Sequence, residues 1–258
     1  MTDARFEIDG SLAFLTFNRP AARNAMTWEM YDALVAACEN ADADENIRVL
    51  VLRGAGAAFV AGTDIAQFTT FGTAADGLAY EKRLDEVVDR LEAVKKPTIA
   101  QVAGVATGGG CVIALACDVR IAASDAQFGV PIARTLGNCL SAANYSRLLD
   151  LIGPARTKDL VFTGRLIDAT EASALGLVNR IVEPEALEAA VKEYAAVIAA
   201  HAPLTLRATK EMIRRLQAHR RIDRAQADDL IALCYTSEDF REGVTAFLQK
   251  RKPVWKGK

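Results

Sequence analysis

Residues 96–122 read KPTIAQVAGVATGGGCVIALACDVRIA, and the order of elements in them is enough to assign a fold class. The apolar run over residues 98–102 follows Lys96-Pro97 and predicts a strand, which Gly104 ends. Gly108-Gly109-Gly110 then opens a helical stretch over residues 111–117, and residues 119–122 again resemble a strand. A strand, a glycine turn, a helix and a second strand in this order are typical of a βα unit in a largely parallel sheet.

The residues before this stretch fit the same α/β class. Residues 6–17 alternate apolar and polar side chains around Asp9-Gly10-Ser11, which predicts a hairpin. Apolar residues at helical spacing predict a helix over residues 27–38 with Thr27 as its N-cap, and another over residues 77–94. The apolar run at residues 49–52 predicts a strand that is buried on both faces.

From residue 142 onward, helical periodicity dominates. Helices are predicted at 142–152, 155–163, 185–200, 204–217 and 226–233, and Gly, Pro or polar residues separate them. No low-complexity linker or shift in composition interrupts the chain. We therefore expect a single-domain unit, with an α/β core at residues 1–200 and a helical C-terminal region at residues 201–258.

The composition excludes several classes of protein. The chain has 258 residues, 51% of them hydrophobic, and a formal net charge of -2, which indicates an ordinary globular domain without an overall attraction to nucleic acid or anionic membrane. The locally basic segment 207–224 lacks interleaved aromatic residues, so we interpret it as a solvated helix face or a subunit contact in preference to an RNA-binding or phosphate-binding surface. No apolar run has the length of a membrane span, and the polar N-terminus favours a cytoplasmic protein.

The cysteines and histidines argue against disulfide, zinc and histidine-dependent chemistry. The chain has five cysteines, which are widely spaced and form no CxxC pair, so neither a disulfide framework nor a metal site is indicated. His201 and His219 are the two histidines, and both lie far in sequence from the glycine turns. We therefore do not expect a Ser-His-Asp, Cys-His or histidine-metal mechanism.

Two glycine-rich turns, Ala61-Gly62-Thr63-Asp64 and Gly108-Gly109-Gly110, each lie between a strand and a helical pattern. Glycine lets backbone N–H groups approach a ligand closely, and the helix after the second turn adds the positive end of its dipole. Such turns suit an oxygen atom that gains negative charge. Neither turn has the spacing of a nucleotide-binding motif, and close packing of a helix is the alternative explanation for each one.

The combination of motifs is far more specific than either turn alone. The sequence resembles the enoyl-CoA hydratase/isomerase (crotonase) superfamily over essentially its whole length. The stretches that match lie in the family's order, at 17–20 with 23–25, 59–65, 96–100, 104 with 108–111, 117–122, 126–129, 163–165, 171–178 and 247–253.

The resemblance implies an α/β fold made as a spiral of ββα units, with a helical C-terminal region that mediates homotrimers, often paired into homohexamers. The substrate would be a coenzyme A thioester. Its carbonyl oxygen would accept hydrogen bonds from the backbone N–H groups of Thr63 and Gly109, which form an oxyanion hole for a thioester enolate. One such donor typically contributes about 3 to 4 kcal/mol of transition-state stabilisation.

The resemblance also implies residues that bind the rest of coenzyme A. Arg23 would lie near the phosphates, and the Ala61 carbonyl would meet the adenine, beside the turn residues Gly62 and Gly108. Phe247 and Lys250 would close over the nucleotide, in the same subunit or from a neighbouring one. Neither a metal nor a further cofactor is implied, because coenzyme A enters as part of the substrate.

The sequence departs from the family where its hydratases carry their two glutamates. The first position, directly after the Gly-Gly-Gly-Cys run, is Val112, and the second, after the proline that follows Gln-Phe-Gly, is Ile132. A register shifted by one position would place Ala133 there instead. Acid/base groups of this kind each contribute about 10²- to 10⁴-fold, so ordinary water addition is not expected. The turn where some isomerases carry one carboxylate reads Asn138-Cys139-Leu140-Ser141 here.

The polar residues that remain near the predicted site are few. Asp64 adjoins the oxyanion turn, although capping of the following helix also explains it. Arg134 and Asn138 lie on the loop beside the acyl group and could orient a departing carboxylate, while an ion pair explains Arg134 equally well. Glu81 is a further candidate, on a helical stretch that could overlie the pocket. Cys139 has no recognisable base to activate it as a nucleophile.

Three hypotheses follow. The favoured one is an acyl-CoA enzyme, a lyase or isomerase of the enoyl-CoA hydratase family, that stabilises an enolate without the two glutamates. Among the reactions open to such an enzyme, decarboxylation or C–C cleavage depends least on a proton acceptor. The second is a non-catalytic CoA-thioester-binding or assembly subunit, and the third is a hydratase or isomerase with a relocated base such as Asp64.

Overall fold

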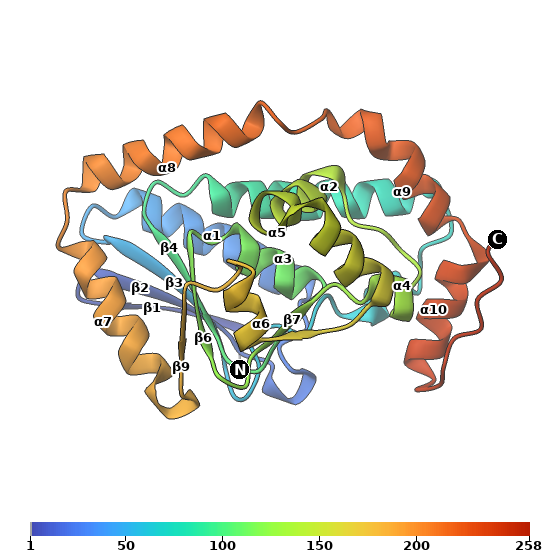
Figure 1. The fold of residues 1–258 in the computed structure, drawn as a ribbon, viewed down its shortest axis with the longest axis horizontal. Helices are drawn as coiled ribbons and strands as arrows, with labels where there is room; N and C mark the ends of the chain where they lie inside the picture. Colours follow the sequence, from blue (N-terminus) through green and yellow to red (C-terminus); the bar gives the residue numbers. More distant parts are fainter. Residues whose placement is uncertain (1) are drawn as a thin grey trace.

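A computed structural model describes residues 2–258, in which two β-sheets are surrounded by helices (Figure 1). The strands are β1 (Ala4–Asp9), β2 (Leu12–Phe17), β3 (Val49–Gly54), β4 (Thr98–Val102), β5 (Val105–Thr107), β6 (Val119–Ala123), β7 (Gln127–Gly129), β8 (Ile167–Asp168) and β9 (Arg180–Val182). The α-helices are α1 (Trp28–Ala43), α2 (Ala74–Glu92), α3 (Gly109–Ala116), α4 (Ile132–Thr135), α5 (Ala142–Thr163), α6 (Ala169–Ala174), α7 (Leu187–Ala199), α8 (Pro203–Ala218), α9 (Asp228–Tyr235) and α10 (Glu238–Leu248). Short 3₁₀ helices are η1 (Pro20–Ala22), η2 (Ile65–Phe68), η3 (Pro184–Ala186) and η4 (Arg224–Ala227).

The large sheet has the strand order β1-β2-β3-β4-β6-β9, and the small sheet has the order β5-β7-β8. In the large sheet β1 and β2 form the predicted antiparallel hairpin, and every following pair is parallel. In the small sheet β5 is parallel to β7, whereas β8 is antiparallel to it. The predicted α/β class is therefore confirmed, together with a C-terminal region that is helical from α7 onward.

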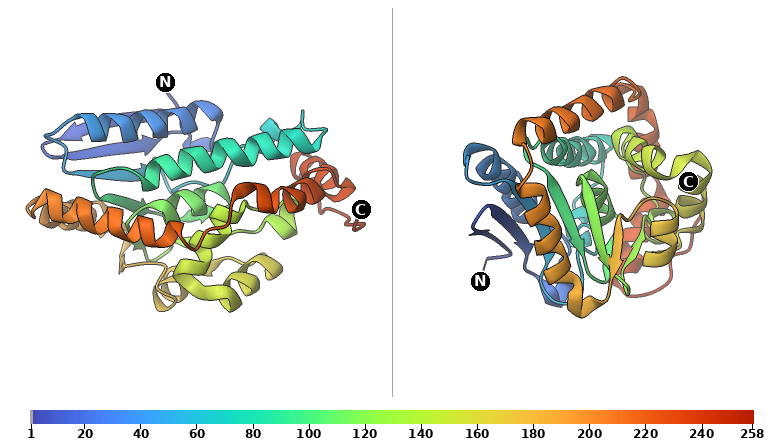
Figure 2. Two further views of the ribbon diagram at one scale, coloured as in Figure 1. Left: turned by 90° about the horizontal axis from the view of Figure 1, so that it is seen from above. Right: turned by 60° about the vertical axis from the view of Figure 1, so that its left-hand side comes forward.

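Alternate residues of the large sheet belong to two different cores. Phe14, Val51 and Ile99 pack in a small cluster with residues of α7. Their neighbours in sequence, such as Leu15 and Leu52, belong to the larger cluster that includes α1, α2 and α3. Because side chains alternate along a strand, helices on both faces require an unbroken apolar run, as predicted for residues 49–52. The right-hand view of Figure 2 shows α7 lying across the sheet.

Several helix boundaries follow from local hydrogen bonds. The Thr27 hydroxyl accepts from the Met30 amide and begins α1, as predicted. Thr73 and Asp76 form a reciprocal capping box at the start of α2. Gly164 ends α5 in a left-handed conformation with φ 59°, which glycine adopts without strain.

The helices expected at 142–152 and 155–163 are confirmed, because α5 consists of two helical segments that meet at a kink, where Gly153 has a φ of 71° just before Pro154. Helices α4, α6 and α10 were not predicted from the sequence. A side chain at position 243 would overlap the backbone of Leu136, so glycine there permits α10 to pack closely against the α4 region.

Helix α8 has no buried residue and runs along the upper edge of the molecule in Figure 1. Its basic residues are largely engaged in ion pairs, such as Lys210 with Asp118 and Arg214 with Glu211. Its exposed side chains include large apolar ones, namely Leu204, Met212, Ile213 and Leu216. Helix α8 therefore shows the solvated face that was expected of this segment, combined with an unpartnered apolar surface.

Candidate functional site

The two glycine turns lie side by side because short parallel bridges connect their flanking residues. Val60 pairs with Ala106 of β5, and Met26 pairs with Thr63. The Val60 amide donates to Val105 O, and the Thr107 amide donates to Val60 O. These bonds bring the end of the first turn next to the start of the second.

Glycine is required at the closest approach of the two turns. Gly62 has a φ of 103° and Gly108 a φ of 53°, both in the region that L side chains rarely adopt. A Cβ atom on Gly108 would lie 3.7 Å from the Gly62 Cα. A Cβ atom on Gly109 would lie 3.8 Å from the Thr63 amide nitrogen, which places the two predicted donor residues in direct proximity.

The amides of Thr63 and Gly109 are both without a protein acceptor within residues 2–258. Gly109 is the first residue of α3, where a backbone N–H has no partner inside its own helix. The neighbouring amides are used, since the Asp64 amide donates to Met26 O and the Gly108 amide donates to Gly129 O. Two unpaired donors from separate turns can stabilise one negatively charged oxygen.

A buried hydroxyl network holds the Thr63 side chain. Its Oγ1 lies 2.8 Å from the Tyr31 hydroxyl and 2.8 Å from the Tyr80 hydroxyl. Burial raises the pKa of both tyrosines, so both hydroxyls keep their protons at neutral pH. The network orients Thr63 from behind and leaves its amide free.

A cavity of about 400 Å³ opens at these two turns. Its predicted substrate-binding residues come from both turns, from the end of η1 and from α10, namely Arg23, which follows η1, and Ala61, Gly62, Gly108 and Phe247. Thr63, Asp64, Gly109 and Asn138 also line it, as does Glu81. The remaining wall is mostly apolar, with Ile65, Phe68, Leu84, Ile132, Leu136, Leu140 and Leu166.

The two positions that carry glutamates in the family's hydratases hold hydrocarbon side chains in different places. Ile132 lines the cavity at the start of α4. Val112 is fully buried on α3 and is not part of the cavity wall. Neither side chain can transfer a proton.

Asp64 lines the cavity, but its carboxylate is already engaged. Its Oδ2 lies 3.1 Å from an Arg19 guanidinium nitrogen, and its Oδ1 accepts from the Ala66 amide as the N-cap of η2. Both oxygens of this carboxylate therefore have protein partners. This geometry fits the capping role that the sequence also allowed.

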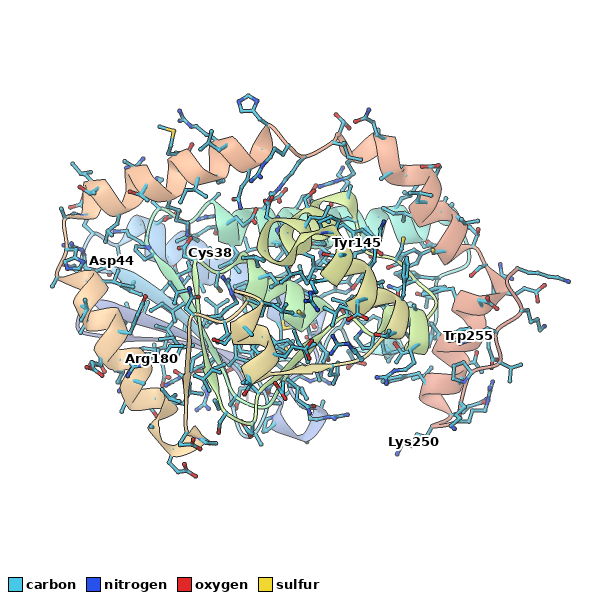
Figure 3. The ribbon with its side chains drawn as sticks, viewed as in Figure 1. Cys38, Asp44, Tyr145, Arg180, Lys250 and Trp255 are labelled. Carbon is cyan, nitrogen blue, oxygen red and sulfur yellow. The ribbon has the colours of Figure 1, made fainter. Side chains whose placement is uncertain are left out.

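Two of the predicted basic residues lie outside the cavity. The Arg134 side chain is exposed at the end of α4, and Lys250 follows α10 with a φ of 53°. Figure 3 shows Lys250 at the outer end of α10. Arg134 and Lys250 therefore do not reach the two glycine turns in the described chain. Arg23, in contrast, lines the cavity.

Glu81 is the buried carboxyl group of the cavity. It lies on α2 with 2% of its surface exposed, and it accepts hydrogen bonds from the Tyr235 hydroxyl at 2.6 Å and from the Ser141 amide at 3.1 Å. Burial raises the pKa of this carboxyl to about 8, against the stabilising hydrogen bond from Tyr235. Glu81 is therefore largely protonated at neutral pH.

Asn138 and Cys139 lie on the loop that faces Glu81. The Asn138 Nδ2 donates to the Tyr235 hydroxyl at 3.1 Å, and its buried Oδ1 has no hydrogen-bond partner among the described residues. The pKa of the Cys139 thiol is raised by its hydrogen bond with Cys234 and by burial. A raised pKa opposes formation of the thiolate that a nucleophilic cysteine requires.

Three tyrosines of this site were not predicted from the sequence. Tyr31 and Tyr80 hold Thr63, and Tyr235 donates to Glu81. Each follows the apolar pattern of its own helix, so a core position was the natural interpretation. No local signal separates a core tyrosine from one whose hydroxyl reaches an active site.

No helix in the described part of the chain has both the length and the apolar character needed to cross a membrane. Within residues 2–258, likewise, no three or more His, Cys, Asp or Glu side chains are grouped as metal ligands would be.

Comparisons with known proteins agree with this architecture. The sequence model of a family described as enoyl-CoA hydratase/isomerase matches residues 7–258. A short-chain-enoyl-CoA hydratase from Clostridium acetobutylicum is 40% identical over 253 residues, covering 95% of this chain and 94% of that protein.

Several solved structures match over the whole of this chain, among them the following two. A crystal structure of an enoyl-CoA hydratase/carnithine racemase from Magnetospirillum magneticum, 97% of which is covered, has a TM-score of 0.81 and 36% sequence identity. Methylmalonyl-CoA decarboxylase in complex with 2-nitronate-propionyl-CoA, 99% of which is covered, has a TM-score of 0.91 and 29% identity.

Proposed function

The chain belongs to the enoyl-CoA hydratase/isomerase family, and we propose that it cleaves a C–C bond next to the α-carbon of an acyl-CoA thioester, as in decarboxylation, through an enolate. One observation carries the proposal. The unpaired amides of Thr63 and Gly109 meet at a cavity whose wall carries Ile132 at one of the two hydratase glutamate positions, while the other position is Val112, which is buried on α3.

The oxyanion hole supplies the main stabilisation. As the bond to the departing carbon breaks, its electron pair moves toward the thioester, and negative charge gathers on the carbonyl oxygen. The Thr63 and Gly109 amides donate to that oxygen, and the start of α3 adds its positive dipole end. Each donor is worth about 10²- to 10³-fold in kcat in a site of this type.

The apolar cavity favours cleavage over hydration. Hydration needs groups that bind and deprotonate a water molecule, and hydrocarbon at positions 112 and 132 provides none. Loss of CO₂ produces the enolate without a base. The close structural likeness to methylmalonyl-CoA decarboxylase supports this choice.

The remaining ligand contacts follow the family pattern. Arg23, at the cavity mouth, would meet the coenzyme A phosphates, the Ala61 carbonyl the adenine, and Phe247 the nucleotide. Asn138 would orient the departing group, whereas Arg134 is directed elsewhere. No cofactor beyond the coenzyme A of the substrate is needed. Lys250 would act from a neighbouring subunit of a homotrimer or homohexamer.

Hydration or isomerisation is the second candidate, because the curated relatives are named as hydratases. It requires a relocated base, and Asp64 is the one that the sequence suggested. Rapid hydration of crotonyl-CoA that disappears in Asp64→Ala would favour this reading. Affinity for acyl-CoA without any turnover would favour a binding or assembly subunit instead.

The proposal is tested with a panel of malonyl-type and β-oxo acyl-CoA thioesters. We expect CO₂ release or thioester cleavage from at least one of them at a rate far above that of crotonyl-CoA hydration. Mass spectrometry of the acyl-CoA products measures both reactions. A panel without turnover would contradict the proposed reaction.

A pair of variants at one position separates the lost donor from added bulk. Gly109→Pro removes the N–H at the first position of α3, where proline is tolerated in helices. Gly109→Ala keeps the N–H but adds a Cβ that would lie 2.9 Å from the Tyr31 hydroxyl. We expect Gly109→Pro to lower kcat at least about 10²-fold, and Gly109→Ala to lower it less. Equal activity of wild type and Gly109→Pro would rule out this donor.

A further inference from the structure

Glu81 is a buried acid in the cavity wall, and the reaction proposed above assigns it no role. Tyr80, Glu81 and Leu84 project from one face of α2 into the wall of the cavity that also contains Thr63 and Gly109. Tyr80 contacts the Thr63 hydroxyl, so the residue next to Glu81 touches the oxyanion turn itself. Helix α2 therefore connects the carboxyl group to the oxyanion hole through adjacent residues.

We propose that Glu81 is the catalytic acid/base of this site, which delivers a proton to the α-carbon of the thioester enolate, and that Tyr235 positions it. This inference rests on the proposed function and names the group that completes it.

The surroundings of Glu81 hold it in the form of a proton donor. Asp85, one helical turn away, has an arginine partner, Arg224, at 3.3 Å. Glu81 forms no ion pair in the described chain. The titratable groups whose pKa values are linked to that of Glu81 are all acids. They lie on α1, α2, α5, α9 and the loop after α4, and they are Tyr31, Tyr80, Asp85, Cys139, Tyr145 and Tyr235. A neutral carboxyl is favoured where no cation faces it.

The hydrogen bonds of Glu81 leave its proton available. One oxygen accepts from the Tyr235 hydroxyl and the other from the Ser141 amide. Both protein partners act as donors to Glu81 in this arrangement, so neither hydrogen bond uses the proton of the neutral carboxyl. The acid proton is therefore free to face the substrate.

Tyr235 is held firmly enough to position this carboxyl. Its ring packs against Phe240 with centroids 4.7 Å apart, and Gly77 of α2 leaves the space in which the ring lies. The Tyr235 hydroxyl receives a hydrogen bond from Asn138 Nδ2, which directs its own proton toward Glu81. Tyr235 thus acts through Glu81 and not on the substrate.

The proton and electron balance of the step is simple. The bond between the α-carbon and the departing carboxylate breaks, CO₂ leaves, and the electron pair forms the enolate. The enolate then takes the proton of Glu81 to form a C–H bond, which leaves a Glu81 carboxylate that water reprotonates after product release. In reverse, the carboxylate removes an α-proton from a saturated thioester.

The test measures that reverse step, because it needs no decarboxylation. Wild type is incubated with butyryl-CoA in D₂O, and α-hydrogen exchange is followed by mass spectrometry. We expect exchange in wild type and a loss of at least about 100-fold in Glu81→Gln. Glu86→Gln, on an exposed position of the same helix, is the matched control and should exchange normally.

The pH profile tests the positioning role. Exchange needs the carboxylate, so its rate should rise with pH and level off above about 8, the pKa to which burial raises Glu81. Tyr235→Phe removes a hydrogen bond that stabilises the carboxylate, so the midpoint should move to higher pH. A lower rate with an unmoved midpoint would mean that Tyr235 is structural only.

The outcomes distinguish this inference from the proposed function. Exchange that is lost in Glu81→Gln, without CO₂ release from any substrate, would overturn the reaction but support Glu81. CO₂ release together with exchange that survives in Glu81→Gln would overturn the role of Glu81. No exchange by wild type that binds butyryl-CoA would also overturn it.

Discussion

Thr63 contributes to the site separately through its backbone and its side chain. Its amide is unpaired at the cavity, while its hydroxyl lies between those of Tyr31 and Tyr80. Because the three groups are buried, removing the threonine hydroxyl would leave tyrosine hydroxyls without a partner, at a cost of about 1 to 3 kcal/mol. A serine at this position would keep both contributions.

Glu81 and Asp85 show how two buried carboxyl groups on one helix can have different surroundings. Both are buried on one face of α2, and burial raises the pKa of each. The hydrogen bond from Ser141 and the charges of Arg224 and Arg147 oppose that rise at Asp85, whereas no cation does so at Glu81. Of these two carboxyl groups, Glu81 is therefore the one without an arginine beside it.

Replacing Glu81 by Gln should change the pH dependence of stability in a known direction. Glu81 has a pKa of about 8 in the folded protein and an ordinary value of 4.5. The folded state therefore binds the proton more tightly, and its stabilising effect is present below 4.5 and is lost as pH rises to about 8. Urea unfolding from pH 5 to 8.5 should show Glu81→Gln gaining stability relative to wild type.

Glu86→Gln is the control for that measurement. Its carboxyl is exposed and pairs only with Lys82 at 4.0 Å, so the difference from wild type should stay nearly constant with pH. A constant difference for Glu81→Gln as well would mean that Glu81 titrates normally.

At the scale of elements, α2 joins the site to the helical C-terminal region. Its first half carries Tyr80 and Glu81 into the cavity, and its last turn carries Glu92. Glu92 accepts hydrogen bonds from Arg147 of α5 and from Arg221, which follows α8. One carboxylate thus connects three segments that are distant in sequence.

Glu92→Gln should destabilise the fold strongly. Burial opposes the charged form, but the hydrogen bonds from Arg221 and Arg147 outweigh it and lower the pKa of Glu92 to about 2. Removing one partner of such a buried network costs about 3 to 5 kcal/mol. Urea unfolding at pH 7 and fixed protein concentration measures the loss, with Glu86→Gln again as the exposed control.

The stability of Glu92→Gln relative to wild type should depend on pH in the opposite direction to that of Glu81→Gln. A lowered pKa stabilises the fold above 4.5, and that contribution is lost as pH falls to about 2. The gap between wild type and Glu92→Gln should therefore narrow in acid. A gap that is independent of pH would attribute the loss to packing alone.

At the scale of the whole molecule, α8 presents an apolar surface that nothing within the described chain covers. Leu204 is 75% exposed and Leu216 is 60% exposed, on a helix without a buried residue. Exposed apolar side chains in a row indicate a protein interface. This supports the homotrimer or homohexamer that we propose from the family.

Charged residues on this surface should separate the subunits. In Ile213→Glu/Leu216→Glu, assembly would bury two carboxylates without partners, so we expect a shift from trimer or hexamer to monomer. Light scattering coupled to size exclusion measures the mass. Ile8→Glu, at an exposed apolar residue of β1, should leave the mass unchanged. An oligomer that withstands the double substitution would place the interface elsewhere.

Local chemistry made much of this protein predictable. Apolar periodicity located β3, β4 and α3, because this signal depends on residues close together in sequence. The glycine turns suggested backbone donors in general, and the resemblance to the family named Thr63 and Gly109 among them. The resemblance to the crotonase superfamily, and the fold that it implies, are confirmed by the family match and the structural neighbours. Helix α10 escaped prediction because the need for Gly243 comes from Leu136, far away in the chain.

The sequence by itself determined the α/β class, the family, and the absence of glutamates at positions 112 and 132. Only the tertiary structure decided which of the other carboxyl groups reaches the cavity without an ion-pair partner, and so could act as an acid or base there. Asp64 adjoins the turn but pairs with Arg19, whereas Glu81 reaches the cavity beside Tyr235, which is 154 residues away. The availability of a carboxyl group depends on burial and on the charges around it, and distant segments supply both only when the chain has folded.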